Sequence, residues 1–431
     1  MTKNKWSVKS ELGIKICSCQ IVCRMIIYLY IKCFFVMRTA LSAVQIAQLN
    51  IPPGMIDLGV GQPSPTMLPL AAIKTAAEHR LNHDGLSYLA YGAEQGDGHF
   101  RVALAQFLTK NYGQQVDLEH LFITAGASQG LDLICTLFTQ PGDTIFVEEP
   151  TYFLALRIFA DHRLNIVGLP MDEDGLIVEA LEEKLIQYKP AFLYTIPTFH
   201  NPSGVILSAS RRKQLSHLCH KHNFLVVADE VYHLLAYTTS PPPPLASYAD
   251  EGMILSLGSF SKILAPGLRL GWIQGRQALL NRFVKCGLLD SGGGLNPFTS
   301  GLVRSAIETG LQQVHLEHLK TVYTKRMRAL SNALRRHLPD ITSFTEPRGG
   351  FFIWLGLPDG VDAEEMLHDA RQQNIGFQPG IKFSSRQGLK KYLRLSFSFY
   401  DTPQLEEGVM RLAHVFKKNL ISNSQLLKKN Q

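Results

Sequence analysis

Between residues 121 and 260 the chain alternates short apolar runs with amphipathic stretches, and this alternation constrains the fold more than any other feature. The apolar runs are LFITAG, DTIFVEEP, RLNIVGLP, AFLYTIP, FLVVADE and MILSLGSF, and helix-like segments such as SQGLDLICTLFT separate them. Strands that are apolar throughout, not only at every second residue, are typical of a parallel sheet with helices on both faces. We therefore predict an α/β fold with a mostly parallel sheet, whose site lies at the carboxyl ends of the strands.

The segments outside this alternation have a different pattern. After Gly310 we expect a long amphipathic helix to about Leu338, then short strands and a helix, and a closing helix from about Thr402 to Leu420. This mixture predicts a smaller α+β domain beside the large one. The predicted parts are an N-terminal extension (1–37), an N-terminal part of the small domain (38–77), a large domain (78–310), the rest of the small domain (311–420) and a polar tail (421–431).

Charge and cysteine are concentrated in residues 1–37. This segment contributes +5 of the net charge of +7, so the remaining chain, with 37 basic and 35 acidic residues, has no pattern of a nucleic-acid-binding surface. Outside it only three scattered cysteines remain, which favours a cytosolic location. The apolar run 25–31 is shorter than the roughly 20 residues of a membrane span. We expect residues 1–37 to be disordered or foreign to the native protein, with a peripheral membrane anchor as the alternative.

The stretch LSLGSFSKILAPGLRLGW, residues 255–272, holds the residues with the clearest chemistry. Lys262 follows small polar residues, among them Ser259, and apolar side chains flank it. Burial disfavours the charged form of an amine, which makes Lys262 a candidate nucleophile toward an aldehyde. Arg269 stands in the next expected strand, Leu268–Ile273, where its guanidinium can pair with a phosphate. A strand, a turn and a strand with an incidental lysine and arginine is the plainer alternative.

Further candidates lie where strands are expected to end. Asp229 ends FLVVADE, a position that suits pairing with a protonated pyridine nitrogen. Asn201, in HNPSG, ends an earlier strand, and either it or Tyr232, in DEVY, can hydrogen-bond a phenolate oxygen. Tyr152, in EEPTYF, can stack on a flat ring. Structural readings stay open for all of these motifs, namely a plain turn, a helix cap and a core position.

The sequence GASQG, residues 126–130, follows an apolar strand and opens a helix. Its backbone N–H groups and the Ser128 hydroxyl can hold a phosphate at the positive end of that helix. Serine is also a common N-cap, so the pattern alone fits both roles. The run HLCHKH, residues 217–222, is dense in histidine and cysteine but has no matching ligand pair elsewhere, and we predict no metal site there.

In their order along the chain, GASQG, PTY, HNPSG, DEVY and SFSKILAPGLRLGW resemble the class I/II aminotransferases of the fold-type-I pyridoxal-phosphate family. The similarity runs from about Gly61 to Phe416 and is greatest to the branch with 2-aminoadipate and kynurenine aminotransferases. The resemblance implies a homodimer with pyridoxal 5′-phosphate as cofactor. The charge and the short apolar run described above predict neither a nucleic-acid partner nor a membrane span. It also implies that an L-amino acid donates its amino group to a 2-oxo acid, expected to be 2-oxoglutarate, by a ping-pong mechanism.

The resemblance gives each matching residue a role. Lys262 would bind the cofactor covalently and shuttle a proton, Arg394 in YLRLSFS would bind the substrate α-carboxylate, and Gly61 and Asn201 would line the same pocket. The residues implied to bind the cofactor besides Lys262 are Ala127, Ser128, Gln129, Tyr152, Asn201, Asp229, Tyr232, Ser259, Arg269 and, across a dimer interface, Tyr91 of YGAEQG.

Fold and cofactor do not fix the reaction, so other activities stay open. A lyase, a decarboxylase or an oxidase would share the cofactor residues. A non-catalytic amino-acid-sensing protein is also possible, although residues 1–37 are too short for a DNA-binding winged helix. The glycine-rich stretch DSGGGLNPFTS, residues 290–300, departs from the pattern of the family, and we expect it to be a loop near the contacts with substrate or partner subunit.

Overall fold

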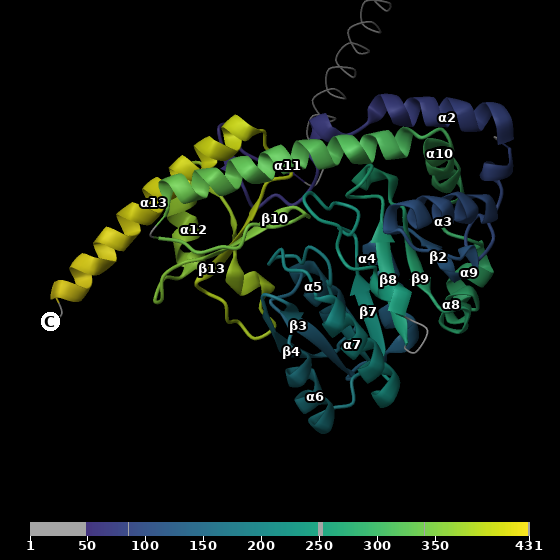
Figure 1. Cartoon of the computed structure of the whole chain (residues 1–431), viewed down its shortest axis with the longest axis horizontal. Coiled ribbons are helices and arrows are strands. Elements are labelled where there is room, and N and C mark those ends of the chain that lie inside the picture. Colours follow the sequence, from purple (N-terminus) through teal and green to yellow (C-terminus); the bar gives the residue numbers. More distant parts are fainter. Residues whose placement is uncertain (1–48, 85, 249–252, 340, 430–431) are drawn as a thin grey trace, which may run out of the picture. The chain divides into compact units, whose positions relative to one another are not determined.

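The computed structural model describes residues 49–84, 86–248, 253–339 and 341–429, with side chains described as far as Lys417. Residues 49–53 belong to a separate compact unit, and the rest, from Gly54 on, make up one unit (Figure 1). The predicted extension 1–37 lies outside the described residues. No helix in the described ranges combines the length and the apolar character that a membrane span needs.

The largest sheet has eight strands. These are β2 (Leu121–Thr124), β3 (Thr144–Glu149), β4 (Asn165–Asp172), β5 (Gly175–Leu176), β6 (Phe192–Thr195), β7 (Leu225–Asp229), β8 (Ile254–Ser259) and β9 (Gly271–Gly275). They lie in the order β2-β9-β8-β7-β6-β3-β4-β5, and all neighbours from β8 to β4 pair in parallel. The pairs β2–β9, β9–β8 and β4–β5 are antiparallel. This mostly parallel sheet confirms the predicted α/β fold.

Helices cover both faces of this sheet. The α-helices between residues 70 and 308 are α2 (Leu70–Asp84), α3 (Gly98–Tyr112), α4 (Ala127–Phe138), α5 (Phe153–Asp161), α6 (Val178–Gln187), α7 (Ala209–His222), α8 (Gln277–Val284), α9 (Gly287–Gly292) and α10 (Pro297–Glu308). Short 3-10 helices are η1 (Pro65–Met67), η2 (Ser87–Leu89), η3 (Leu118–His120), η4 (Leu245–Tyr248), η5 (Pro266–Leu268) and η6 (Gly380–Phe383).

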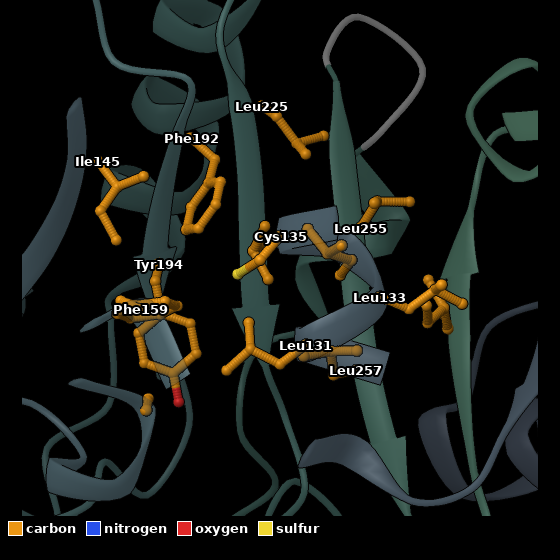
Figure 2. Close-up of a cluster of buried hydrophobic side chains, with 14 of the residues drawn as sticks. Leu131, Leu133, Cys135, Ile145, Phe159, Phe192, Tyr194, Leu225, Leu255 and Leu257 are labelled. Atoms are coloured by element: carbon orange, nitrogen blue, oxygen red, sulfur yellow. The ribbon is translucent and has the colours of Figure 1, made fainter. Parts of the chain in front are cut away.

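The strands are apolar throughout because neighbouring residues point into two different cores. In β3, Ile145 and Val147 belong to a core that includes Leu131 and Leu133 of α4. Figure 2 shows Ile145, Leu131 and Leu133 within this core. Phe146 between them belongs to the opposite core, together with side chains of α6 and α7. Since successive side chains of a strand point to opposite faces, a strand covered on both faces needs apolar residues at every position.

The C-terminal part contains a smaller sheet. Its antiparallel strands β10 (Phe352–Gly356), β13 (Tyr392–Ser396) and β12 (Gln378–Pro379) lie in that order, and we call it the small sheet. The helices of this part are α11 (Leu311–His337), α12 (Ala363–Gln372) and α13 (Thr402–Lys429) (Figure 1). In addition, β1 (Ile56–Asp57) pairs in parallel with β11 (Ile375–Gly376). Helix α2 runs through residue 77, and the exact domain boundaries stay predictions.

Two expected boundaries were wrong. Residues 290–300 are not one loop, because α9 continues to Gly292 and α10 starts at Pro297, a residue whose fixed φ favours the first turn of a helix. The closing helix does not end near Leu420 but continues to Lys429, so that most of the predicted polar tail is helical.

Candidate active site

Neighbouring strand ends of the eight-stranded sheet carry the candidate residues. Asp229 is the last residue of β7 and Ser259 is the last residue of β8. Because β6, β7 and β8 are parallel neighbours, their carboxyl ends lie at one edge of the sheet, where sites of such sheets are found. Asn201 was expected at a strand end, but β6 ends at Thr195 and Asn201 lies in the turn that follows.

Lys262 follows β8 and points toward the N-terminal segment of the folded unit. Its Nζ donates a hydrogen bond to the carbonyl oxygen of Gly61 at 3.1 Å. The same nitrogen lies 5.8 Å from the ring centre of Tyr232 and 5.7 Å from that of Phe351. The amine therefore lies in a largely aromatic environment with one backbone acceptor.

This environment changes the acidity of the amine. Burial lowers the pKa of Lys262 to about 8, and the positive charges of Arg394 and Arg269 act in the same direction, whereas Asp229 opposes them. The neutral amine, which is the nucleophilic form, is therefore well populated near pH 8. This supports the expectation drawn from the apolar residues around Lys262.

Asp229 is buried and has one side-chain donor. The hydroxyl of Tyr194, a fully buried residue of β6, donates to Asp229 Oδ2 at 2.8 Å. Burial raises the pKa of Asp229, and the hydrogen bond from Tyr194 partly offsets that effect. Sequence reasoning missed Tyr194. The signal was a single phenol in the otherwise apolar run AFLYTIP, since a buried phenol needs a hydrogen-bond partner.

The N-terminus of α4 and Arg269 lie against each other. Gly126 precedes α4 with φ +91°, and a Cβ at this position would lie 2.7 Å from Arg269 Nη2, so a side chain here would be strained and would displace the guanidinium. Arg269 itself is not in a strand as expected: it has φ +45° and lies between η5 and β9. Its guanidinium donates to Ser261 Oγ at 3.4 Å and to the carbonyl oxygen of Ala125 at 3.3 Å.

The remaining residues predicted to hold a phosphate lie near this arginine. Ala127, Ser128 and Gln129 form the first turn of α4, where backbone N–H groups have no partner within the helix. The side chain of Gln129 is engaged elsewhere, because its Oε1 accepts from the backbone N–H of Ala125 at 3.1 Å. The Ser259 hydroxyl accepts from the backbone N–H of Ser261 at 3.1 Å. Backbone donors, hydroxyls and a guanidinium thus converge, as an anion site requires.

Arg394 of β13 is buried and forms hydrogen bonds to two distant parts of the chain. It donates from Nη1 to Asn201 Oδ1 at 2.9 Å and from Nη2 to the carbonyl oxygen of Gly59 at 2.8 Å. Its guanidinium carbon lies 4.0 Å from the ring centre of Phe352 and 5.1 Å from that of Phe383. Burial lowers the pKa of Arg394 to about 10. The Nε atom is buried and has no hydrogen-bond partner among the described residues, so a donor is available for a carboxylate.

Gly61 connects the two charged side chains. Its carbonyl oxygen accepts from Lys262, and a Cβ on Gly61 would lie 3.2 Å from Arg394 Nη2. Lys262 and Arg394 are therefore brought to one small space, although they lie far apart in the sequence. Tyr152 lies close to Asp229 and Arg394, whose charges influence its acidity, and burial raises the pKa of Tyr152 to about 12. Tyr91, in contrast, is 88% exposed.

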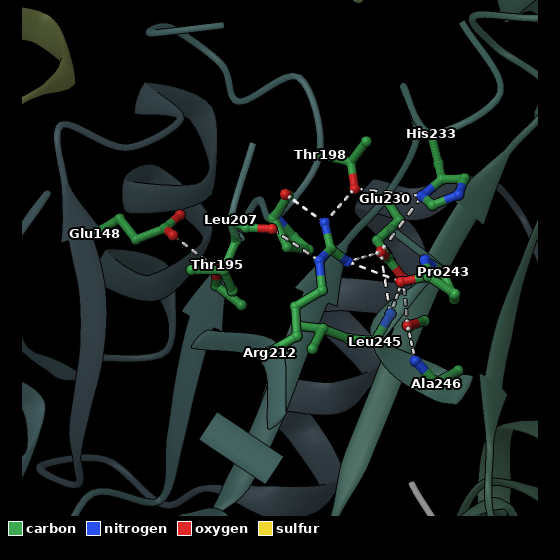
Figure 3. Close-up of polar contacts among 12 residues, drawn as sticks. Glu148, Thr195, Thr198, Leu207, Arg212, Glu230, His233, Pro243, Leu245 and Ala246 are labelled. Carbon is green, nitrogen blue, oxygen red and sulfur yellow. Dashed lines mark hydrogen bonds and ion pairs between the residues drawn. The ribbon is translucent and has the colours of Figure 1, made fainter. Parts of the chain in front are cut away.

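A buried polar network surrounds Glu230, the residue that follows Asp229 in the sequence (Figure 3). Arg212 of α7 is fully buried and donates to Thr198 Oγ1 at 2.8 Å, to the carbonyl oxygen of Pro197 at 2.6 Å and to Glu230 Oε1 at 3.4 Å. Burial favours the neutral form of Glu230, but His233 and Arg212 outweigh it and lower the pKa of that carboxyl. The network fixes Glu230, the neighbour of Asp229, and the loop after β6.

The donor and acceptor groups of this site fit pyridoxal 5′-phosphate. A phosphate matches the α4 N-terminus with Arg269, a protonated ring nitrogen matches the carboxylate of Asp229, and an aldehyde matches the amine of Lys262. The unpartnered Nε of Arg394 fits a substrate carboxylate beside the amine. The described residues contain no group of three or more His, Cys, Asp or Glu that could hold a metal ion. Fold and site thus match what a fold-type-I pyridoxal-phosphate enzyme requires.

Comparisons with known proteins narrow this class. Residues 53–412 match the family model "Aminotransferase class I and II". The chain is 34% identical to aromatic-amino-acid aminotransferase 1 of Thermococcus litoralis over 85% of this chain and 89% of that protein. It is 31% identical to 2-aminoadipate transaminase of Thermus thermophilus, over 86% and 93%. The structure of kynurenine aminotransferase from Pyrococcus horikoshii in complex with PMP matches with TM-score 0.80 and 33% identity, over 89% of this chain and 94% of that one.

The chain therefore belongs to the class I and II aminotransferase family and is a pyridoxal-phosphate-dependent transaminase. This confirms the family, the enzyme class and the cofactor that the sequence predicted. The roles of the individual residues are proposals, for which the geometry above gives the physical basis.

Proposed function

We propose that the enzyme transfers the amino group of an L-amino acid to 2-oxoglutarate by a ping-pong exchange. The observation that carries the proposal is the position of Gly61, which brings the Lys262 amine and the Arg394 guanidinium together. Donor and acceptor both have a carboxylate next to the reacting carbon, so one arginine can bind each of them in turn. A single arginine that serves two substrates successively is the arrangement that a ping-pong exchange needs.

Each residue then has a defined task. Bound pyridoxal phosphate supplies an aldehyde that accepts the amino group and a ring that withdraws electrons. Asp229 holds the positive charge of the ring nitrogen, while the α4 N-terminus and Arg269 hold the phosphate. Arg394 binds the substrate carboxylate and so places Cα near Lys262, which removes the Cα proton and later returns a proton as general base and general acid.

The choice of acceptor rests on a relative. The Thermus protein named 2-aminoadipate transaminase acts on an amino acid with carboxylates at both ends, and 2-oxoglutarate likewise has two carboxylates. A pocket of that kind in this chain would accept 2-oxoglutarate as well as a donor with another side chain.

We also propose a homodimer in which Tyr91 reaches the phosphate of the partner subunit. Large apolar side chains are exposed in the segment 86–91 and, next to it, at Leu288 and Phe298; Gly92 and Gly294 form a β-bridge that joins the two segments. Exposed apolar patches of this kind are typical of subunit interfaces. Sedimentation velocity tests the dimer, and a fully active monomer contradicts it. A cytosolic location is supported by the free thiols of Cys135, Cys219 and Cys286.

The reaction is tested by product stoichiometry. The purified holoenzyme is incubated with each of a panel of L-amino acids, with and without 2-oxoglutarate, and oxo acid, glutamate, ammonia and CO₂ are measured. We expect one oxo acid for each glutamate and no sustained product without the acceptor. Ammonia without an acceptor would indicate a lyase or an oxidase, CO₂ a decarboxylase, and binding without any product a sensing protein.

A further inference from the structure

Two neighbouring buried glutamates at the end of β3 have different partners. Glu148 accepts from the Thr195 hydroxyl and from the backbone N–H of Ile196, each at 2.7 Å, so its hydrogen bonds stay within the eight-stranded sheet and the loop after β6. Glu149 instead bonds the segment between η6 and β13. The hydroxyl and the backbone N–H of Ser385 donate to its Oε2 at 2.6 and 2.8 Å.

Ser384 completes this contact. Its hydroxyl donates to Glu149 Oε1 and accepts from the backbone N–H groups of Arg386 at 3.2 Å and Gly388 at 2.8 Å. Glu149 thus binds the two serines, and Ser384 in turn bonds the backbone of Arg386 and Gly388 in the loop 384–388. This loop leads into β13, the strand that carries Arg394.

The contact extends to Arg394 through Phe383. The backbone N–H of Thr151, two residues after Glu149, donates to the carbonyl oxygen of Phe383 at 2.9 Å. The Phe383 ring lies 5.2 Å from the ring of Phe153 and 5.1 Å from the guanidinium carbon of Arg394. The end of β3 therefore holds a side chain that packs against the arginine.

The loop conformation depends on such external support. Gln387 in the loop and Leu389 just after it have φ values of +59° and +62°. This region costs free energy for residues with a side chain and persists when the surroundings impose it. The loop also fits closely against β4, because a Cβ on Gly168 would lie 2.5 Å from Ser385 Oγ and 3.0 Å from Glu149 Oε2.

We propose that Glu149 is a positioning residue for Arg394, which it orients through the loop 384–388 and Phe383. The proposal rests on the proposed function of Arg394 as the group that binds the substrate carboxylate. Glu149 touches neither substrate nor cofactor in this account. Its loss leaves the cofactor residues in place but lets Phe383 and the guanidinium move, so that a carboxylate must order them when it binds.

The test measures two affinities in the same variants. The probe is 3-phenylpropanoate, a carboxylate without an amino group, whose dissociation constant from the holoenzyme is measured by calorimetry; the affinity of the apoenzyme for pyridoxal phosphate is measured in parallel. In Glu149→Gln an amide NH₂ faces the donors of Ser385, and we expect the dissociation constant of the probe to rise about tenfold. We expect the affinity for pyridoxal phosphate to change less than about twofold.

Two further variants secure the interpretation. Gly168→Ala keeps the charge of Glu149 but places a methyl group against both Ser385 Oγ and Glu149 Oε2, so it disturbs their contact. We expect it also to weaken binding of the probe, and it provides the test if Glu149→Gln fails to fold. The matched control is Asp172→Asn at the end of neighbouring β4, whose carboxylate accepts from Arg211 Nη2 at 2.7 Å and from the backbone N–H of Asp174 at 2.9 Å, away from the small sheet. We expect no change in either affinity there.

Each outcome decides between the two proposals. Tenfold weaker binding of the probe with unchanged cofactor affinity supports the positioning role. Unchanged binding of the probe in both Glu149→Gln and Gly168→Ala, or an equal loss in Asp172→Asn, overturns it and leaves the proposed function intact. If the probe does not bind the wild type, or binds equally to Arg394→Gln, the proposed role of Arg394 is wrong and the role of Glu149 falls with it.

Discussion

The site has two ends that are built in different ways. At the cofactor end, Asp229, Ser259 and Lys262 lie on or just after adjacent strands of one sheet, and the α4 N-terminus and Arg269 face them from the same part of the fold. At the carboxylate end, Arg394 comes from the small sheet and contacts Asn201 and Gly59, which lie in two other segments of the chain.

This difference has a functional consequence. The cofactor end depends on strand ends that the hydrophobic cores on both faces of the sheet hold in place. The carboxylate end depends on how the small sheet docks against the large one, and therefore on contacts such as that of Glu149 with Ser385. We expect substitutions at the first end to change cofactor affinity and chemistry, and substitutions at the second to change mainly the affinity for substrates.

The largest effect is expected for Lys262→Ala. The substitution removes both the nucleophilic amine and the group that moves the Cα proton, and loss of such acid–base catalysis costs up to about 10⁴-fold in rate. Turnover measured as oxo acid formed per enzyme should fall by about that factor, whereas the exposed Lys285→Ala serves as a control with full activity. Activity of Lys262→Ala within tenfold of wild type would contradict the assignment.

Arg394→Gln is expected to separate the two ends. Removing one partner of a buried charge pair costs about 2–5 kcal/mol, so the KM of the donor should rise by at least about 30-fold. The affinity of the apoenzyme for pyridoxal phosphate should fall much less, because Arg394 bonds Asn201 and Gly59 and not the groups proposed to hold the phosphate. The lost contact with Asn201, itself predicted to bind the cofactor, should account for the change that remains. An equal loss of both affinities would show that the two ends are not independent.

A smaller effect is expected for Tyr194→Phe. The substitution deprives the buried Asp229 carboxylate of its donor, which costs about 1–3 kcal/mol and raises the pKa of Asp229, so that pyridoxal phosphate should bind roughly tenfold more weakly. Tyr323→Phe is the matched control, because Tyr323 is equally buried and its hydroxyl has no hydrogen-bond partner among the described residues. Equal cofactor affinity in both variants would refute the role of Tyr194.

The smallest expected effects concern the pKa of Lys262. In the apoenzyme its amine should titrate at about pH 8, against an ordinary pKa of 10.5, when labelled with acetic anhydride over a range of pH. Because Asp229 raises and Arg394 lowers this pKa, Asp229→Asn should shift it further down and Arg394→Gln should shift it up. A midpoint near 10.5 in the wild type would contradict the burial of the amine.

The arrangement of the cofactor end could be predicted from the sequence for a physical reason. Continuously apolar strands define the sheet, and the residues that follow them along the chain, such as Asp229 and Lys262, must lie at its carboxyl edge. Local motifs therefore carry most of the geometry there. Even so, Arg269 was placed in a strand, because the left-handed residue before β9 is not evident from an apolar run.

The carboxylate end was less predictable because its contacts join residues far apart in the sequence. Arg394 contacts Gly59 over a separation of 335 residues, and Glu149 contacts Ser385 over 236. Neither the pairing of these residues nor the packing of Phe383 on the guanidinium follows from periodicity. The resemblance to a known family was enough to single out Arg394. The contacts of Glu149, which we propose to position Arg394, became visible only in the structure.

The most direct test of the whole account is the absorbance spectrum of the purified holoenzyme during titration with amino acids in the absence of any oxo acid. We predict that at least one donor converts the pyridoxal form of the cofactor into the pyridoxamine form, that 2-oxoglutarate reverses the change, and that Lys262→Ala does not undergo it. A pyridoxal spectrum that no amino acid converts would contradict the assignment of the chain's activity as amino-group transfer.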